Sequence, residues 1–171
     1  MHLFLAALFA IIVLVPRPAW TQTQTNRLPA TRDSISLNVL QAMDYAEHIR
    51  LVTLTMCRRK PELVQRLPAC LKITNVPNAV IEKMALPHFN RYVSSADAKA
   101  ALAFWSSPEG TKISKIMLQE IADNNRNLLT ENERQLLSNF NQSEAGIALS
   151  RLTGDRAVSQ AMIRAIGAYV L

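Results

Sequence analysis

Residues 95–116 read SADAKAALAFWSSPEGTKISKI, and residues 131–152, 36 positions further along the chain, read ENERQLLSNFNQSEAGIALSRL. Aligned in this way, the two stretches share four identical positions, whereas composition alone would give only about one or two. The identical pairs are Phe104 and Phe140, Ser107 and Ser143, Gly110 and Gly146, and Ser114 and Ser150. This pattern predicts an internal repeat in the second half of the chain.

Each stretch contains the signals of a helical hairpin. Residues 130–133 have the Thr-x-x-Glu spacing of a capping box, and residues 94–97 are a looser Ser-x-x-Asp version of it. A short helix should follow, and then a Ser-x-x-Gly step in which Ser107 precedes Pro108 as an N-cap residue precedes a first-turn proline. The next helix is longer, and its apolar stripe in the first unit extends to Leu128.

The four glycines all lie at or beyond Gly110, so the first 109 residues lack both a phosphate-binding Gly-rich loop and the tight turns of hairpins. Gly110 and Gly146 fall in the first turn of the longer helices. We expect them to permit the close approach of a neighbouring helix rather than to bind phosphate.

A chain of 171 residues is long enough for one domain with a sizeable core. Its 49% hydrophobic and 19% charged residues exclude disorder, collagen and a bundle of membrane helices. Together with the helical signals, this composition predicts an all-α fold: a compact helical domain of about six to eight helices, with two tandem helical-hairpin units in its C-terminal half.

Four further helices are expected outside the repeat. A long first helix should start near Ser34 and end around residues 58–60, because its apolar residues recur at helical spacing. Pro61 suits the first turn of a short second helix. A third helix should reach Pro87, which kinks or ends it. The last helix, within residues 158–169, should belong to the core.

Residues 3–15 form an uninterrupted apolar run, which suits a signal peptide and is shorter than the roughly 20 residues that cross a bilayer. We interpret residues 1–21 as a signal peptide, residues 22–33 as a flexible leader and residues 34–171 as a single helical domain. The protein would then be exported to a periplasm of the Gram-negative type and would not be transmembrane after cleavage. An uncleaved membrane anchor is the alternative interpretation.

Cys57 and Cys70 are the only cysteines, and an oxidising compartment favours joining them. We therefore predict a disulfide, with two free buried cysteines as the alternative. A zinc site would need the paired short spacings of thiol ligands, which are missing. The 12 intervening residues exclude a redox pair of the Cys-x-x-Cys type.

Residues 104–113, FWSSPEGTKI, with the cap at residues 95–97 before them, resemble the motif of the bacterial exported family catalogued as domain of unknown function 2059. In that family an aromatic pair, a Ser-Pro, a Gly and a Lys follow an N-capped helix in this order. The resemblance covers residues 94–152 and implies an α-helical periplasmic domain without established catalytic residues. Trp105 stands where the family more usually has Tyr, and the upstream half with the cysteines is not covered.

Patterns that carry catalysis are sparse. His48 and His88 lie in no known nucleophile or metal motif. Asp44 and His48, four residues apart, would share a helix face and could orient an imidazole, although a solvated pair is the simpler explanation. Glu131 and Glu133 could form the acid/base pair of a cell-wall hydrolase, but their places at a helix start are explained by capping. We assign no catalytic residue, metal site or cofactor and do not expect an enzyme.

Two surfaces remain as candidates for binding. Trp105 differs in character from its repeat counterpart Asn141, so we expect it to be exposed and to make a contact. A basic cluster at the end of the first helix suits an anionic partner, with a plain solvated face as the alternative. The candidate interaction residues are Trp105, Ser107, Pro108 and Gly110 on one surface, and Arg58, Arg59 and Lys60 on the other.

The leading hypothesis is therefore a non-enzymatic periplasmic domain that binds a protein or another envelope component. The alternatives are an immunity-type inhibitor of a toxin delivered to the periplasm, and a cell-wall hydrolase. Nucleic acid is not expected as a partner, because base-stacking aromatics are not interleaved with the positive charges.

Overall fold

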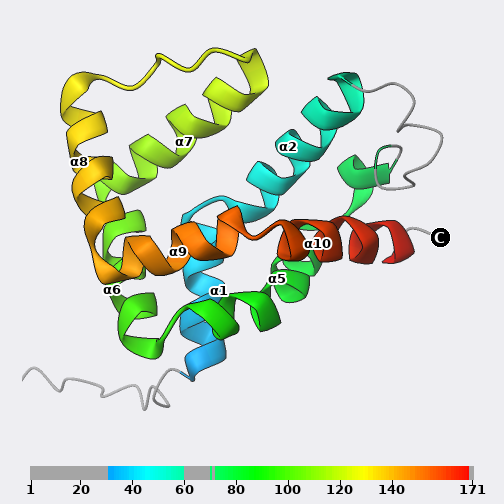
Figure 1. Ribbon diagram of the computed structural model, residues 1–171, viewed down its shortest axis with the longest axis horizontal. Coiled ribbons are helices and arrows are strands. Elements are labelled where there is room, and N and C mark those ends of the chain that lie inside the picture. The colour runs from blue at the N-terminus through cyan, green and yellow to red at the C-terminus, as the bar shows by residue number, and fades with distance from the viewer. Residues whose placement is uncertain (1–30, 60–69, 71, 170–171) are drawn as a thin grey trace, which may run out of the picture.

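The computed structural model describes residues 31–59, 70 and 72–169. These residues form eight α-helices and one short 3-10 turn, η1, with no strand among them, so the predicted all-α fold is confirmed (Figure 1). The elements are α1 (Arg32–Ala42), α2 (Tyr45–Arg59), η1 (Ile73–Asn75), α5 (Asn78–Tyr92), α6 (Ser95–Trp105), α7 (Pro108–Asp123), α8 (Glu131–Gln142), α9 (Glu144–Gly154) and α10 (Arg156–Tyr169).

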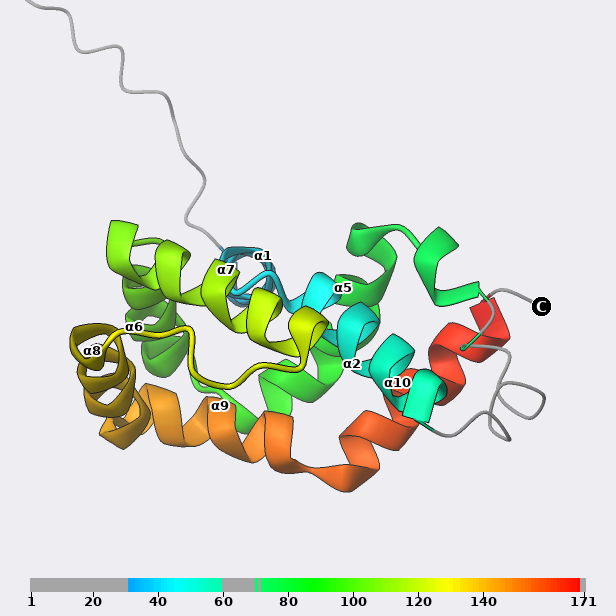
Figure 2. The ribbon, with the colours of Figure 1, turned by 90° about the horizontal axis from the view of Figure 1, so that it is seen from above.

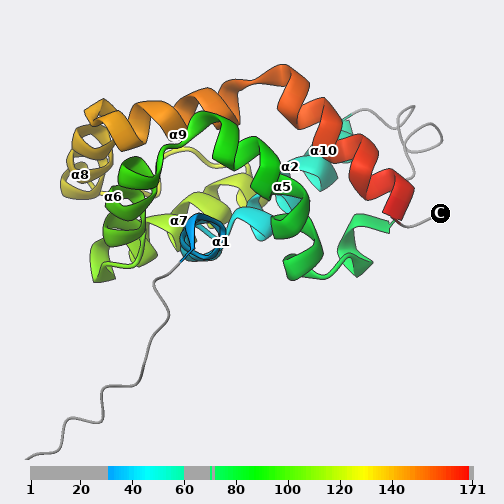
Figure 3. The ribbon, with the colours of Figure 1, turned by 90° about the horizontal axis from the view of Figure 1, so that it is seen from below.

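Helix α1 contacts α2, α5 and α6 and is seen end-on in Figure 3. Its Val39 and Leu40 are fully buried. Thr31 caps the helix, because its hydroxyl oxygen accepts a hydrogen bond of 3.2 Å from the amide of Ser34. The helix thus begins at Arg32, slightly before the predicted start at Ser34.

The prediction of one long first helix is wrong, because the chain turns between α1 and α2. Asp44 has φ of 50°, in the left-handed region, where an α-helix cannot continue. The hydroxyl of Ser114 on α7 lies 2.9 Å from the carboxylate of Asp44 and 3.1 Å from the carbonyl of Met43. The apolar stripe runs on across this turn, so it does not reveal the break.

Helix α5 continues through Pro87 to Tyr92, so of the two predicted effects of this proline, a kink or an end, the end is wrong. Pro87 is exposed, whereas Ile81, Ala85 and Phe89 on the opposite face are buried. Proline has no amide hydrogen, so the helix lacks one backbone hydrogen bond there, and the packing of the buried face compensates for it.

A disulfide joins Cys57 near the end of α2 to Cys70, with 5.8 Å between the Cα atoms, as predicted. It ties α2 to the segment that leads into η1. The short helix predicted after Pro61 lies outside the described residues, as does Lys60.

The two predicted helical hairpins are present as α6–α7 and α8–α9. In the first, the Ser107 hydroxyl accepts from the amide of Gly110 at 3.0 Å and donates to the Phe104 carbonyl at 2.7 Å. In the second, the hydroxyl of Ser143 makes the same two bonds, at 3.2 Å and 2.6 Å. The repeat in the sequence is thus a repeat in hydrogen bonding.

Gly110 and Gly146 allow a close approach, as predicted. A Cβ atom at Gly110 would lie 2.1 Å from the Phe104 carbonyl oxygen, and one at Gly146 would lie 2.1 Å from the Phe140 carbonyl oxygen. Each glycine therefore lets the first turn of one helix press against the end of the helix before it.

The longer helix of the first unit ends earlier than predicted. Asn124 has φ of 52° and caps α7 in the left-handed conformation. Leu128 therefore lies in the loop, where its amide donates to the Glu120 carboxylate at 2.9 Å.

Helices α9 and α10 follow one another along one side of the molecule (Figure 3), and α2 contacts α7 on another (Figure 2). Val158, Met162 and Ile166 of α10 are buried, which confirms a final core helix. Tyr169 at its end is 52% exposed.

Candidate functional site

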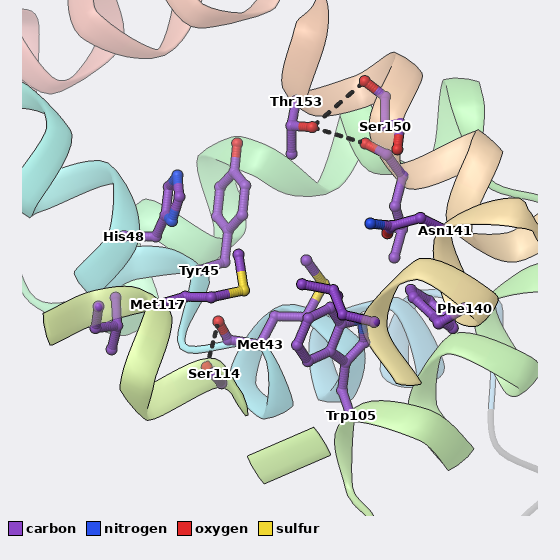
Figure 4. A pocket seen from close by; sticks show the side chains of 13 residues that line it. Met43, Tyr45, His48, Trp105, Ser114, Met117, Phe140, Asn141, Ser150 and Thr153 are labelled. Carbon is purple, nitrogen blue, oxygen red and sulfur yellow. Dashed lines mark hydrogen bonds between the residues drawn. The ribbon is translucent and has the colours of Figure 1, made fainter. Parts of the chain in front are cut away.

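A pocket of about 280 Å³ lies where α2, α6, α7, α8 and α9 converge (Figure 4). Its inner wall is withdrawn from solvent, since Tyr45 and Trp105 are each only 5% exposed. Its rim is formed by the exposed residues Asn141, Ser150 and Thr153. The pocket is therefore a half-open hollow with a mostly apolar inner wall and a polar mouth.

The two repeat units line this pocket with equivalent positions. Counterparts 36 residues apart face it in three pairs: Trp105 and Asn141, Ser114 and Ser150, and Met117 and Thr153. The first unit thus supplies the indole and a thioether, while the second supplies an amide and a hydroxyl at the same two positions. The site lies between the units, and their divergence at these two positions places apolar groups opposite polar ones.

The turn at Asp44 adds a third wall, because it directs α2 so that Tyr45 and His48 line the pocket. Burial raises the pKa of Tyr45 to about 12 and lowers the pKa of His48. Both side chains are therefore uncharged at neutral pH. The described lining residues include no Asp, Glu, Lys or Arg, so the wall carries no formal charge.

Trp105 is buried, so the prediction that it makes an exposed contact is wrong. Its ring packs edge-on against Phe104 and Phe140, with centroids 5.0 Å and 5.6 Å away. Because the two units pack face to face, this position of α6 points inward rather than to solvent. Its Nε1 is buried and has no hydrogen-bond partner among the described residues.

The step from Ser107 to Gly110 serves the fold. Ser107 is the N-cap of α7, Pro108 occupies the first position of that helix, and Gly110 is buried against α6. The Ser107 hydroxyl and the Gly110 amide are bonded to each other in capping, and only Pro108 and Glu109 of the step are exposed.

The basic cluster is separate from the pocket. Arg58 and Arg59 are exposed in the last turn of α2, and the Arg59 guanidinium donates to the side-chain oxygen of Asn124. Arg59 also borders a second hollow of about 670 Å³, together with Val52 and Arg126. The structure therefore does not bring the two predicted binding surfaces together.

The acidic residues weighed for catalysis have other partners. Asp44 is bonded to Ser114, and not to His48, so these two side chains form neither an oriented dyad nor a solvated pair. Glu133 closes the capping box, accepting from the Thr130 amide at 2.8 Å, and it pairs with Lys112 at 2.7 Å. Capping therefore explains this glutamate, as expected.

In the part of the chain that the structure describes, no three His, Cys, Asp or Glu side chains gather as metal ligands would. None of the described helices combines the length and apolar character needed to cross a membrane.

Sequence reasoning missed the pocket, because its walls come from five helices. One signal pointed to it: Trp105 and its repeat counterpart Asn141 differ in character, and both line the space between the units. Compared with family models, with curated proteins and with solved structures, this chain matches none of them significantly.

Proposed function

We propose that this chain is an exported, non-enzymatic binding domain of the periplasm, and that it holds a compact apolar ligand between its two repeat units. The observation that carries this proposal is the half-open pocket of about 280 Å³, whose described lining residues carry no charge. Apolar cavities about half this size bind benzene, so this one suits a molecule of about ten non-hydrogen atoms.

Binding rather than catalysis is supported by how the pocket's polar groups are used. The Ser114 hydroxyl donates a hydrogen bond to the Asp44 carboxylate, and the Thr153 hydroxyl donates one to the Leu149 carbonyl at 3.1 Å. His48 has no hydrogen bond to a described residue that would orient its imidazole. No nucleophile and base therefore lie paired among the described lining residues.

Export is supported by the apolar run at residues 3–15 and by the disulfide between Cys57 and Cys70, since such bonds persist in oxidising compartments. Membership of the family catalogued as domain of unknown function 2059 agrees with this assignment and stays a prediction.

A thermal-unfolding experiment tests the pocket. Saturating α-methylstyrene should raise the unfolding midpoint of the purified protein, because a ligand that binds only the folded state stabilises it. Ser150→Trp fills the rim and should abolish the shift. Ser159→Trp makes the same change at an exposed position of α10 and should preserve it. An unchanged wild-type midpoint would refute the proposal.

A further inference from the structure

Among the described residues, the indole Nε1 of Trp105 is the one side-chain nitrogen or oxygen that is hidden from solvent and has no hydrogen-bond partner, and Trp105 lines the pocket. The Trp105 side chain is only 5% exposed, and its Nε1 atom is hidden from solvent. No described residue accepts its proton. A buried donor without an acceptor costs free energy, and native proteins keep very few of them. A group of this kind on a residue that lines a pocket is a candidate donor to a bound ligand.

We propose that the ligand of this pocket is a compact, uncharged molecule with an apolar body and one carbonyl-type oxygen, which accepts a hydrogen bond from Trp105 Nε1. This inference rests on the proposed function and names the chemical class of the ligand. Trp105 supplies a donor only, so the complementary group on the ligand must be an acceptor.

The wall excludes an ion. Asp44 lies in the chain between the lining residues Met43 and Tyr45, but it does not line the pocket, and its carboxylate accepts a hydrogen bond of 2.9 Å from Ser114. A carboxylate or ammonium ligand would lose its hydration without gaining an opposite charge from the lining residues. An uncharged oxygen loses far less hydration free energy, and the hydrogen bond from Nε1 compensates for that loss.

The pocket can also adapt to admit the oxygen. Met43 and Met117 line it beside the indole, and Figure 4 shows their flexible side chains reaching into the space that Trp105 faces. Thioether side chains change rotamer at little cost. Because Nε1 is hidden from solvent, a ligand oxygen reaches it only after a neighbouring side chain moves, and we expect Met43 or Met117 to make that movement.

Three probe molecules of equal size distinguish the effects of apolar shape, of the hydrogen-bond acceptor and of charge. Acetophenone carries the acceptor, α-methylstyrene has the same shape without it, and benzoate carries the acceptor with a charge. Trp105 is the only tryptophan beyond residue 21, so its indole N–H signal can be followed by NMR in the exported protein. Acetophenone should move this proton signal downfield, and α-methylstyrene should leave it nearly in place.

Affinities measured in the same titrations complete the test. Trp105→Phe should weaken acetophenone binding about fivefold, the worth of one hydrogen bond, and change α-methylstyrene binding less than twofold. Benzoate should bind at least about tenfold more weakly than acetophenone.

The outcomes distinguish the two proposals. If both neutral probes bind and the N–H signal responds equally to each, the hydrogen bond is refuted and the apolar pocket stands. Benzoate binding as tightly as acetophenone would refute the uncharged class. If neither neutral probe perturbs the resonances of the pocket up to its solubility limit, the proposed function fails as well.

Discussion

Phe104 and Phe140 occupy the same position in the two repeat units, and their rings stack with centroids 4.1 Å apart and planes 7° from parallel. Contact between a residue and its own counterpart is what an approximate two-fold rotation between two units produces. The helices obey the same relation, since α6 contacts α9 and α7 contacts α8. The pocket borders this stack at Phe140, so both features belong to the interface between the units.

The glycines of the repeat should be the positions least tolerant of a methyl group. Gly110→Ala and Gly146→Ala each place a Cβ atom 2.1 Å from a backbone carbonyl oxygen, which has no free rotation to relieve the clash. Overpacking of this kind costs about 1–3 kcal/mol of unfolding free energy, and we expect the upper end of that range in urea titrations.

Gly154→Ala is the matched control, because a Cβ atom there meets nothing within 4 Å. It should leave the unfolding free energy within about 0.5 kcal/mol of wild type or raise it slightly. Equal effects of all three substitutions would show that the contacts with the Phe104 and Phe140 carbonyls do not matter.

The turn between α1 and α2 should depend on Asp44. Asp44→Ala puts alanine in a left-handed conformation and removes the acceptor of the Ser114 hydroxyl, so we expect a loss of about 1–2 kcal/mol in urea unfolding. Asp44→Asn keeps both the acceptor and the tolerance for positive φ, and it should recover most of that loss. An alanine variant as stable as wild type would contradict this role.

How far the sequence predicts this fold depends on the range of the interactions involved. Capping residues, the Ser-x-x-Gly steps and the disulfide involve partners close in sequence, so their spacing is sufficient to predict them. The turn at Asp44 is different, because its partner Ser114 is 70 residues away. No periodicity within residues 32–59 records that contact.

The pocket and the burial of Trp105 were unpredictable for the same reason. A tryptophan at the end of a short helix is exposed or buried according to what packs on it, here Phe140 from the second unit. The repeat gave the relation between the units in sequence, but only the fold shows that they face each other.

The disulfide should carry a measurable part of the stability. Replacing Cys57 and Cys70 together by serine should lower the unfolding free energy by about 3 kcal/mol, the value expected for a loop of 13 residues. Reductant should lower the stability of wild type to a similar level and leave the double variant unchanged. Wild-type protein that stays equally stable with both thiols alkylated would show that the bridge contributes little.

Glu133 should make the stability of the protein depend on acid. Its bond with Lys112, and then its bonds with Thr130, lower the pKa of this carboxyl from 4.5 to about 2. A carboxyl whose pKa is lower in the folded state stabilises the fold at pH values above its unfolded pKa, and this contribution disappears as pH falls from about 4.5 towards 2. Glu133→Gln should therefore destabilise the protein at pH 7, and the difference in unfolding free energy from wild type should shrink steadily below pH 4.5.

The control for this prediction is Glu131→Gln, which removes an exposed carboxylate from the same helix turn, 3.4 Å from Arg134, and should have little effect at any pH. Urea unfolding of the three proteins between pH 7 and pH 2 measures these free energies. If the difference between wild type and Glu133→Gln stays constant with pH, the ion pair with Lys112 is not the cause of that difference.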